Sequence, residues 1–217
     1  MKMKIILLLL SMIPFYSFAQ KCPEGTLNPQ IDIVVQNLQI DQQKNVSQLK
    51  SLSSHNLHFP IGLYRGNKVI NIEPFHQIQY SNAGACSKTV QLKLKIELTP
   101  IIYISQEAQK FRCTYDRVYE HEMTHFKIEI NALNKLKRNL YDYILKKYSS
   151  PIFGSNEAEL KAYLHQLNQS SLSYIYEFLE AETLPFHQTI DTPENYKNEA
   201  KKCSHQENVS LTQLLGR

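Results

Sequence analysis

One long segment without a helix breaker most constrains what this chain can fold into. Residues 113–149 contain neither Pro nor Gly, the two residues least compatible with a helix interior. Apolar residues recur there at the three- and four-residue intervals that place side chains on one helix face: Val118, Ile128, Ala132, Leu133, Leu136, Leu140 and Ile144. The pattern predicts a long amphipathic helix that packs this face against the rest of the protein.

Two histidines lie four residues apart on the predicted helix. They belong to the sequence His121-Glu122-Met123-Thr124-His125, and positions i and i+4 project from the same side of a helix. Two imidazoles placed in this way can reach one tetrahedral zinc ion. Glu122 lies beside them, where it can take a proton from a metal-bound water. The spacing therefore predicts one Zn²⁺ ion held by His121 and His125, with Glu122 as the catalytic base.

Extending the apolar stripe backward places ionisable residues on the inward face of this helix, namely His121, Glu122, His125 and Glu129. Buried polar groups need partners, and a metal ion would supply them. The alternative is a pair of core histidines that are hydrogen-bonded to their neighbours. For Glu129, one turn beyond His125, two roles are open: accepting a hydrogen bond from a ligand imidazole, or pairing with a nearby lysine.

A catalytic zinc site needs a third protein ligand. The favoured candidate is His187, because it follows Pro185, where the chain must change direction, and because its apolar neighbours Leu184 and Phe186 can bury it. Three acidic residues of the same region are alternatives: Asp191, Glu182 and Glu180. A tyrosine such as Tyr196 or Tyr176 could stabilise the oxyanion.

The region before the helix is predicted to form strands. Residues 89–98 alternate apolar and polar side chains without exception, which is typical of a strand with one buried face. Further strands are expected at 31–40, 61–64 and 69–80, with a turn at 65–68. Pro100 interrupts the alternating strand, so residues 101–105 are expected to form a short edge strand that could align a substrate.

A second helix is expected over residues 156–182, and Pro185 should end it. Strands followed by two long helices predict an α+β fold, with an antiparallel sheet in the N-terminal half and the zinc-binding helix after it.

Residues 1–19 have the character of a secretory signal peptide. Lys2 and Lys4 precede an apolar stretch at 5–13, and small residues near Ala19 suit a signal peptidase. The remaining residues, 20–217, are expected to form a single domain that is secreted or periplasmic and has no membrane segment. The formal charge is +4 at pH 7 and includes those two lysines, so no nucleic-acid partner is expected.

Four cysteines remain after the predicted signal, and an exported chain is expected to oxidise them to disulfides. Three pairings are possible. The favoured one joins Cys86 to Cys113 and Cys22 to Cys203.

The stretch from His121 to Glu129 resembles the metal helix of zincin metallopeptidases. More broadly, residues 85–191 are similar to an uncharacterised family of bacterial secreted or periplasmic proteins predicted to be zinc-dependent proteases. In that family a cysteine opens an alternating strand, a proline closes it and the histidine pair follows, although Thr124 stands here where Gly is usual. The resemblance implies a zincin-like fold and a peptide or protein substrate. It leaves open a non-catalytic exported binding protein that zinc merely stabilises, and a module without metal.

Overall fold

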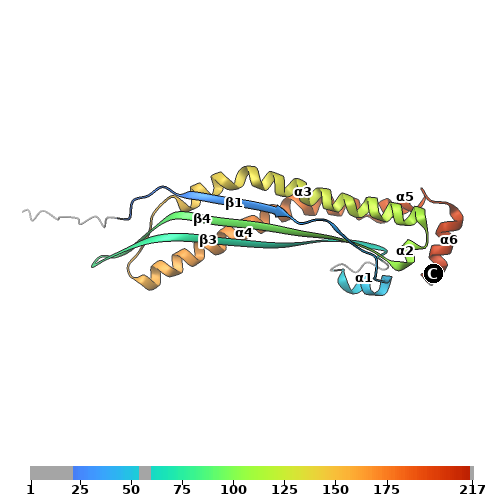
Figure 1. Ribbon diagram of the computed structural model, residues 1–217, viewed down its shortest axis with the longest axis horizontal. Helices are drawn as coiled ribbons and strands as arrows, with labels where there is room; N and C mark the ends of the chain where they lie inside the picture. Colours follow the sequence, from blue (N-terminus) through green and yellow to red (C-terminus); the bar gives the residue numbers. More distant parts are fainter. Residues whose placement is uncertain (1–21, 54–59, 216–217) are drawn as a thin grey trace, which may run out of the picture.

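The computed structural model describes residues 22–53 and 60–215, and the predicted signal peptide lies outside them. The molecule is elongated, with two long helices running along a sheet of long strands (Figure 1). The elements follow one another as β1 (Asn28–Val35), β2 (Gln39–Asp41), α1 (Val46–Leu52), β3 (Gly62–Ser81), β4 (Gly84–Ile104), α2 (Gln106–Gln109), α3 (Arg112–Tyr148), β5 (Ile152–Gly154), α4 (Glu157–Ile190), α5 (Pro193–Ala200) and α6 (His205–Leu214). The predicted α+β class is confirmed.

The sheet is mixed, so the prediction of an antiparallel sheet was wrong. β4 is its central strand: β3 and β5 pair with it antiparallel, whereas β1 and β2 pair with it parallel. The predicted strand at 31–40 is divided into β1 and β2. Alternation within one strand reports which face is buried and says nothing about the direction of its neighbours.

The predicted edge strand at 101–105 is instead the end of β4, where Ile102 lies between Ile40 of β2 and Tyr64 of β3. Pro100 is tolerated inside a central strand because it lies level with the break between β1, which ends opposite Leu98, and β2, which begins opposite Ile101. The ladder that the missing N–H would interrupt is already interrupted there.

The predicted turn at 65–68 is also absent, because β3 continues through it in register with β4. Glycine at position 66 leaves room for a neighbouring side chain and does not form a turn. A Cβ at this position would lie 2.7 Å from the hydroxyl oxygen of Tyr64, so a larger residue would displace that side chain.

The two long helices and the sheet share one core. Inward-facing residues of β4 pack against the inner face of α3 and against α4, as in the buried set Leu94, Ile96, Leu136, Leu140, Ile144, Ile175 and Leu179. The opposite face of β4 carries Lys93, Lys95 and Glu97. The predicted first helix is therefore confirmed, and α3 extends about 55 Å along the sheet.

α4 continues past Pro185 to Ile190, so the predicted helix end was wrong. Proline inside a helix costs about 3 kcal/mol. Packing compensates on both sides of it, because Leu179 and Thr183 are buried before Pro185 and His187 and Asp191 contact α3 after it.

Two disulfides join Cys22 to Cys86 and Cys113 to Cys203, so the favoured pairing was wrong. Cys86 lies near the start of β4 and Cys113 follows its end, and a strand of that length separates them by roughly 60 Å. The disulfides indicate an oxidising compartment outside the cytoplasm. Within the described ranges, no helix combines the length and apolar character that crossing a membrane requires.

Candidate metal centre

The inner face of α3 carries polar residues in its first half and apolar residues in its second. Glu122, His125 and Glu129 are buried at the same helical spacing that continues through Ala132 and Leu136. The predicted inward placement is therefore correct for these residues. His121 is slightly more open, with 13% of its side chain exposed.

Three ligand atoms converge at the end of α4. The carboxylate oxygen Oδ1 of Asp191 lies 3.0 Å from Nε2 of His121 and 3.1 Å from Nε2 of His125, and the two Nε2 atoms are 3.3 Å apart. Asp191 is the C-terminal cap residue of α4, and this position depends on the helix continuing through Pro185. The structure thus joins the predicted histidine pair to Asp191, one of the alternatives to His187.

The spacing of these atoms fits a zinc ion. Ligands at 2.0–2.1 Å from a tetrahedral zinc lie about 3.3 Å from one another, close to the three distances observed. Two imidazoles and a carboxylate are a common donor set for catalytic zinc.

Comparisons of the chain with protein-family models, with curated proteins and with solved structures find no match.

His187, the predicted third ligand, lies against the opposite edge of the His125 ring. Its Nδ1 is 2.7 Å from Nδ1 of His125, the ring nitrogen that does not face Asp191. The other two candidates lie elsewhere: Glu182 pairs with Lys135 at 2.5 Å, and Glu180 is exposed. Among the described residues, the metal-competent group at this place consists of His121, His125 and Asp191.

Glu122 is buried between α3 and the beginning of β3. A Cβ at Gly62 would lie 2.6 Å from Oε1 of Glu122, so the absence of a side chain at Gly62 makes room for the carboxylate. The backbone of Tyr64 forms a hydrogen bond with Glu122. Burial raises the pKa of Glu122 to about 7, which His121 and the Tyr64 hydrogen bond oppose. A carboxylate with such a pKa is suited to exchanging protons near neutral pH.

Burial and charges within the group favour the metal-binding forms of Asp191 and His125, whereas they favour the protonated form of His121. Burial would raise the pKa of Asp191, but contacts with His121 and His125 hold it well below its usual range. Burial lowers the pKa of His125, so this imidazole is neutral at pH 7 and can offer a lone pair. Burial would also lower the pKa of His121, but Asp191 and Glu122 raise it.

Sequence reasoning named Tyr196 without a specific signal, and the structure places it in the group. Its hydroxyl donates a 2.7 Å hydrogen bond to Oδ1 of Asp191, and its ring centroid is 5.1 Å from that of His121. Burial raises the pKa of Tyr196, so it remains a donor. Tyr176 is exposed on α4.

Two residues of β3 that lie beside the candidate metal centre were not predicted from the sequence. Lys68 pairs with Glu129 at 2.7 Å, and the ring of Tyr64 lies parallel to that of His125 with centroids 6.3 Å apart. Both occupy inward positions of β3, a face that the wrongly predicted turn obscured. Glu129 pairs with Lys68, as one of its two predicted roles requires, and its other neighbour is His187, whose Nε2 lies 3.7 Å away and which is outside the metal-competent group.

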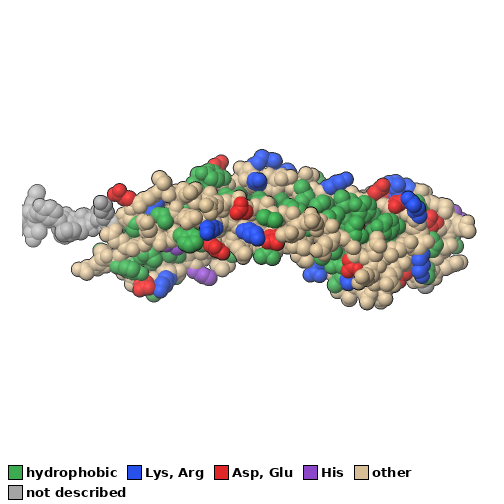
Figure 2. Space-filling model, in the orientation of Figure 1, with side chains coloured by type: hydrophobic (Ala, Val, Ile, Leu, Met, Phe, Trp, Pro, Cys, Tyr) green, Lys and Arg blue, Asp and Glu red, His purple; other side chains and the backbone are tan. Residues whose placement is uncertain are grey.

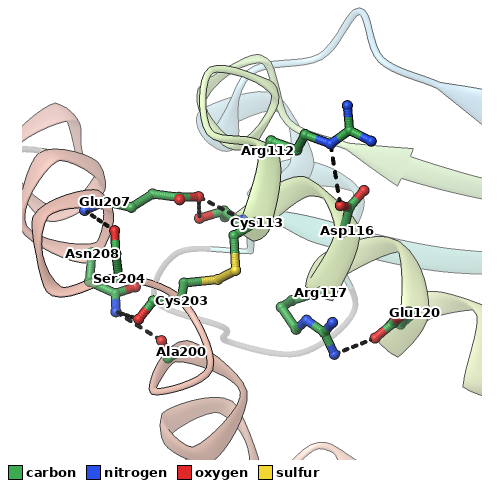
Figure 3. Close-up of a disulfide and its surroundings, with 11 residues drawn as sticks. Arg112, Cys113, Asp116, Arg117, Glu120, Ala200, Cys203, Ser204, Glu207 and Asn208 are labelled. Carbon is green, nitrogen blue, oxygen red and sulfur yellow. Dashed lines mark hydrogen bonds and ion pairs between the residues drawn. A yellow bond between two sulfur atoms is a disulfide. The ribbon is translucent and has the colours of Figure 1, made fainter.

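The C-terminal segment is fastened to the first turn of α3 (Figure 3). Beside the Cys113–Cys203 disulfide, the Glu207 carboxylate accepts hydrogen bonds from the backbone N–H of Thr114 at 2.8 Å and from its hydroxyl at 3.0 Å. Phe111, the N-terminal cap residue of α3, makes no side-chain cap hydrogen bond, so Glu207 supplies this function from α6. Cys113, Cys203 and Glu207 also cluster, but the disulfide uses both sulfur atoms.

We expect Glu207→Ala to lower the free energy of unfolding by about 1 kcal/mol, the usual cost of losing a helix N-cap. Chemical denaturation of the variant and the wild type measures this difference in the free energy of unfolding. Asp116→Ala is the matched control, because Asp116 lies near the same end of α3 that Glu207 caps and forms an exposed pair with Arg112. Equal, small effects of the two substitutions would contradict the capping role of Glu207.

Proposed function

We propose that this protein is a secreted or periplasmic zinc-dependent metallopeptidase, as its resemblance to zincins implies. The observation that carries the proposal is the convergence of His121 Nε2, His125 Nε2 and Asp191 Oδ1 within 3.0–3.3 Å of one another, beside buried Glu122. When bound there, zinc would activate a water molecule and polarise a substrate carbonyl.

The side chains around the metal would have separate roles in the reaction. His121, His125 and Asp191 would hold the metal, with His187 no longer needed as a ligand. Glu122 would accept the proton of the attacking water and pass it to the leaving amine. Tyr196, whose hydroxyl is a hydrogen-bond donor beside Asp191, would hold that carboxylate in place.

An extended peptide is the substrate class that the surrounding backbone suits. Glu122 accepts its hydrogen bond from Tyr64 in β3, and among the described strands β3 pairs only with β4. The other edge of β3 would therefore run beside the base, and a peptide added to it would present its carbonyls there. On the face that Figure 2 shows, Lys and Arg side chains are interspersed with Asp and Glu side chains, which favours a partner other than nucleic acid.

The test is metal-dependent cleavage of unfolded protein substrates, with new termini identified by mass spectrometry. We expect a strong chelator to abolish cleavage and one equivalent of zinc to restore it. Cleavage that persists after complete metal removal would refute the proposal. A fully zinc-loaded protein without any cleavage would instead support the non-catalytic, zinc-stabilised alternative.

A further inference from the structure

His125 makes contacts through both of its ring nitrogens. Nε2 faces His121 and Asp191, whereas Nδ1 lies 2.7 Å from Nδ1 of His187. Two imidazole nitrogens at this distance share one hydrogen, so one must donate and the other accept. The choice between the two tautomers follows from what His125 does on its other side.

A histidine that ligates a metal through Nε2 must leave that nitrogen unprotonated. The proton of neutral His125 then resides on Nδ1, which donates to Nδ1 of His187. His187 accepts through Nδ1 and, when neutral, carries its own proton on Nε2. That nitrogen lies 3.7 Å from Oε1 of Glu129, so the N–H faces a carboxylate.

The carboxylate at the end of this series is held in place from a third element. Lys68 of β3 lies 2.7 Å from the other oxygen of Glu129, whose side chain is only 7% exposed. Lys68, Glu129, His187 and His125 thus form one series of contacts, buried at Glu129 and His125 and half-buried at its other two members, that connects β3, α3 and α4 and ends at the candidate metal ligand.

We propose that His187 is a positioning residue, which accepts the Nδ1 proton of His125 and so fixes the tautomer and ring orientation in which His125 can bind a metal through Nε2. This inference rests on the proposed metal centre. It assigns to His187 an outer contact of the kind that tunes metal affinity, with Glu129 and Lys68 fixing the tautomer of His187 in turn.

The experiment compares His187→Leu with His187→Gln, because Gln has a side-chain oxygen that can accept the Nδ1 proton and Leu has none. Zinc affinity is measured by competition with a chromophoric chelator, and ¹⁵N NMR of labelled histidines reports the tautomer of His125. We expect both variants to bind one zinc. His187→Leu should weaken binding about 10- to 100-fold, the usual effect of losing an outer hydrogen bond, and Gln should recover most of it.

The NMR readout separates positioning from general packing. In zinc-loaded wild type, the Nδ1–H of His125 should be protected from exchange; in His187→Leu this protection should be lost. Glu182→Gln is the matched control, because the Lys135–Glu182 pair also links α3 to α4 but involves no member of the series. It should leave both zinc affinity and tautomer unchanged.

Three results would overturn the inference. Equal zinc affinity in wild type and His187→Leu would show that the contact has no effect. Loss of one imidazole from the cobalt-substituted spectrum in both His187 variants would make His187 a ligand. Wild type that binds no zinc would remove the proposed function as well, which distinguishes that failure from the first two.

Discussion

Glu122→Gln is expected to lower the rate of peptide hydrolysis about 10²- to 10⁴-fold, the range that a positioned general base contributes, while zinc stays bound. Gln has nearly the same size and can occupy the space that Gly62 leaves open. Its amide cannot accept a proton, so the attacking water would lose its base. The measurement is kcat for a peptide substrate, with metal content determined on the same sample.

Glu120→Gln provides the control for this substitution. Glu120 lies on the exposed side of α3, where it pairs with Arg117 at 2.6 Å, and its replacement should leave turnover unchanged. If Glu122→Gln retained wild-type turnover with zinc bound, the assignment of the base would be wrong.

The pH profile adds a second readout for the same residue. A general base works when ionised, so activity should rise with pH through the pKa of Glu122, which burial raises to about 7 without metal. A bound cation would move this limb to lower pH because it favours the carboxylate. The limb should be absent from the residual activity of Glu122→Gln.

Asp191→Ala is expected to have the largest effect on metal binding. The carboxylate of Asp191 contacts both histidines, and its loss leaves two protein ligands where a catalytic zinc site needs three. We expect zinc affinity to fall by more than the 10- to 100-fold that an outer hydrogen bond contributes. Competition with a chelator measures the change.

Glu182→Ala is the matched control for Asp191→Ala. Both are acidic residues of the same part of the chain, but Glu182 pairs with Lys135 and lies outside the metal-competent group. Its replacement should not alter zinc affinity. Equal losses in the two variants would indicate that both act through helix packing, and an unaffected Asp191→Ala would exclude this residue as a ligand.

The parts of this structure that depend on local periodicity could be predicted from the sequence. α3, the inward placement of Glu122 and His125, and the α+β class all follow from spacings of three, four or two residues. The His121–His125 pair is such a feature, because both ligands lie on one helix and no long-range contact is needed to bring them together.

The parts that depend on distant contacts could not be predicted. Pro100 and Pro185 were each expected to end an element, yet the break between β1 and β2 accommodates one and packing on α3 outweighs the cost of the other. The choice between His187 and Asp191 depends on that same helix continuation. Disulfide pairing depends on which ends of the molecule meet, and the great length of β4 places Cys86 and Cys113 at opposite ends.

X-ray absorption at the zinc edge of the loaded wild-type protein, beside Asp191→Ala, tests the central proposal most directly. We expect one zinc per chain with two imidazoles and one carboxylate among its ligands, and loss of the carboxylate contribution in the variant. A wild-type protein that holds no zinc, or one whose zinc has three imidazole ligands and is unchanged in Asp191→Ala, would contradict it.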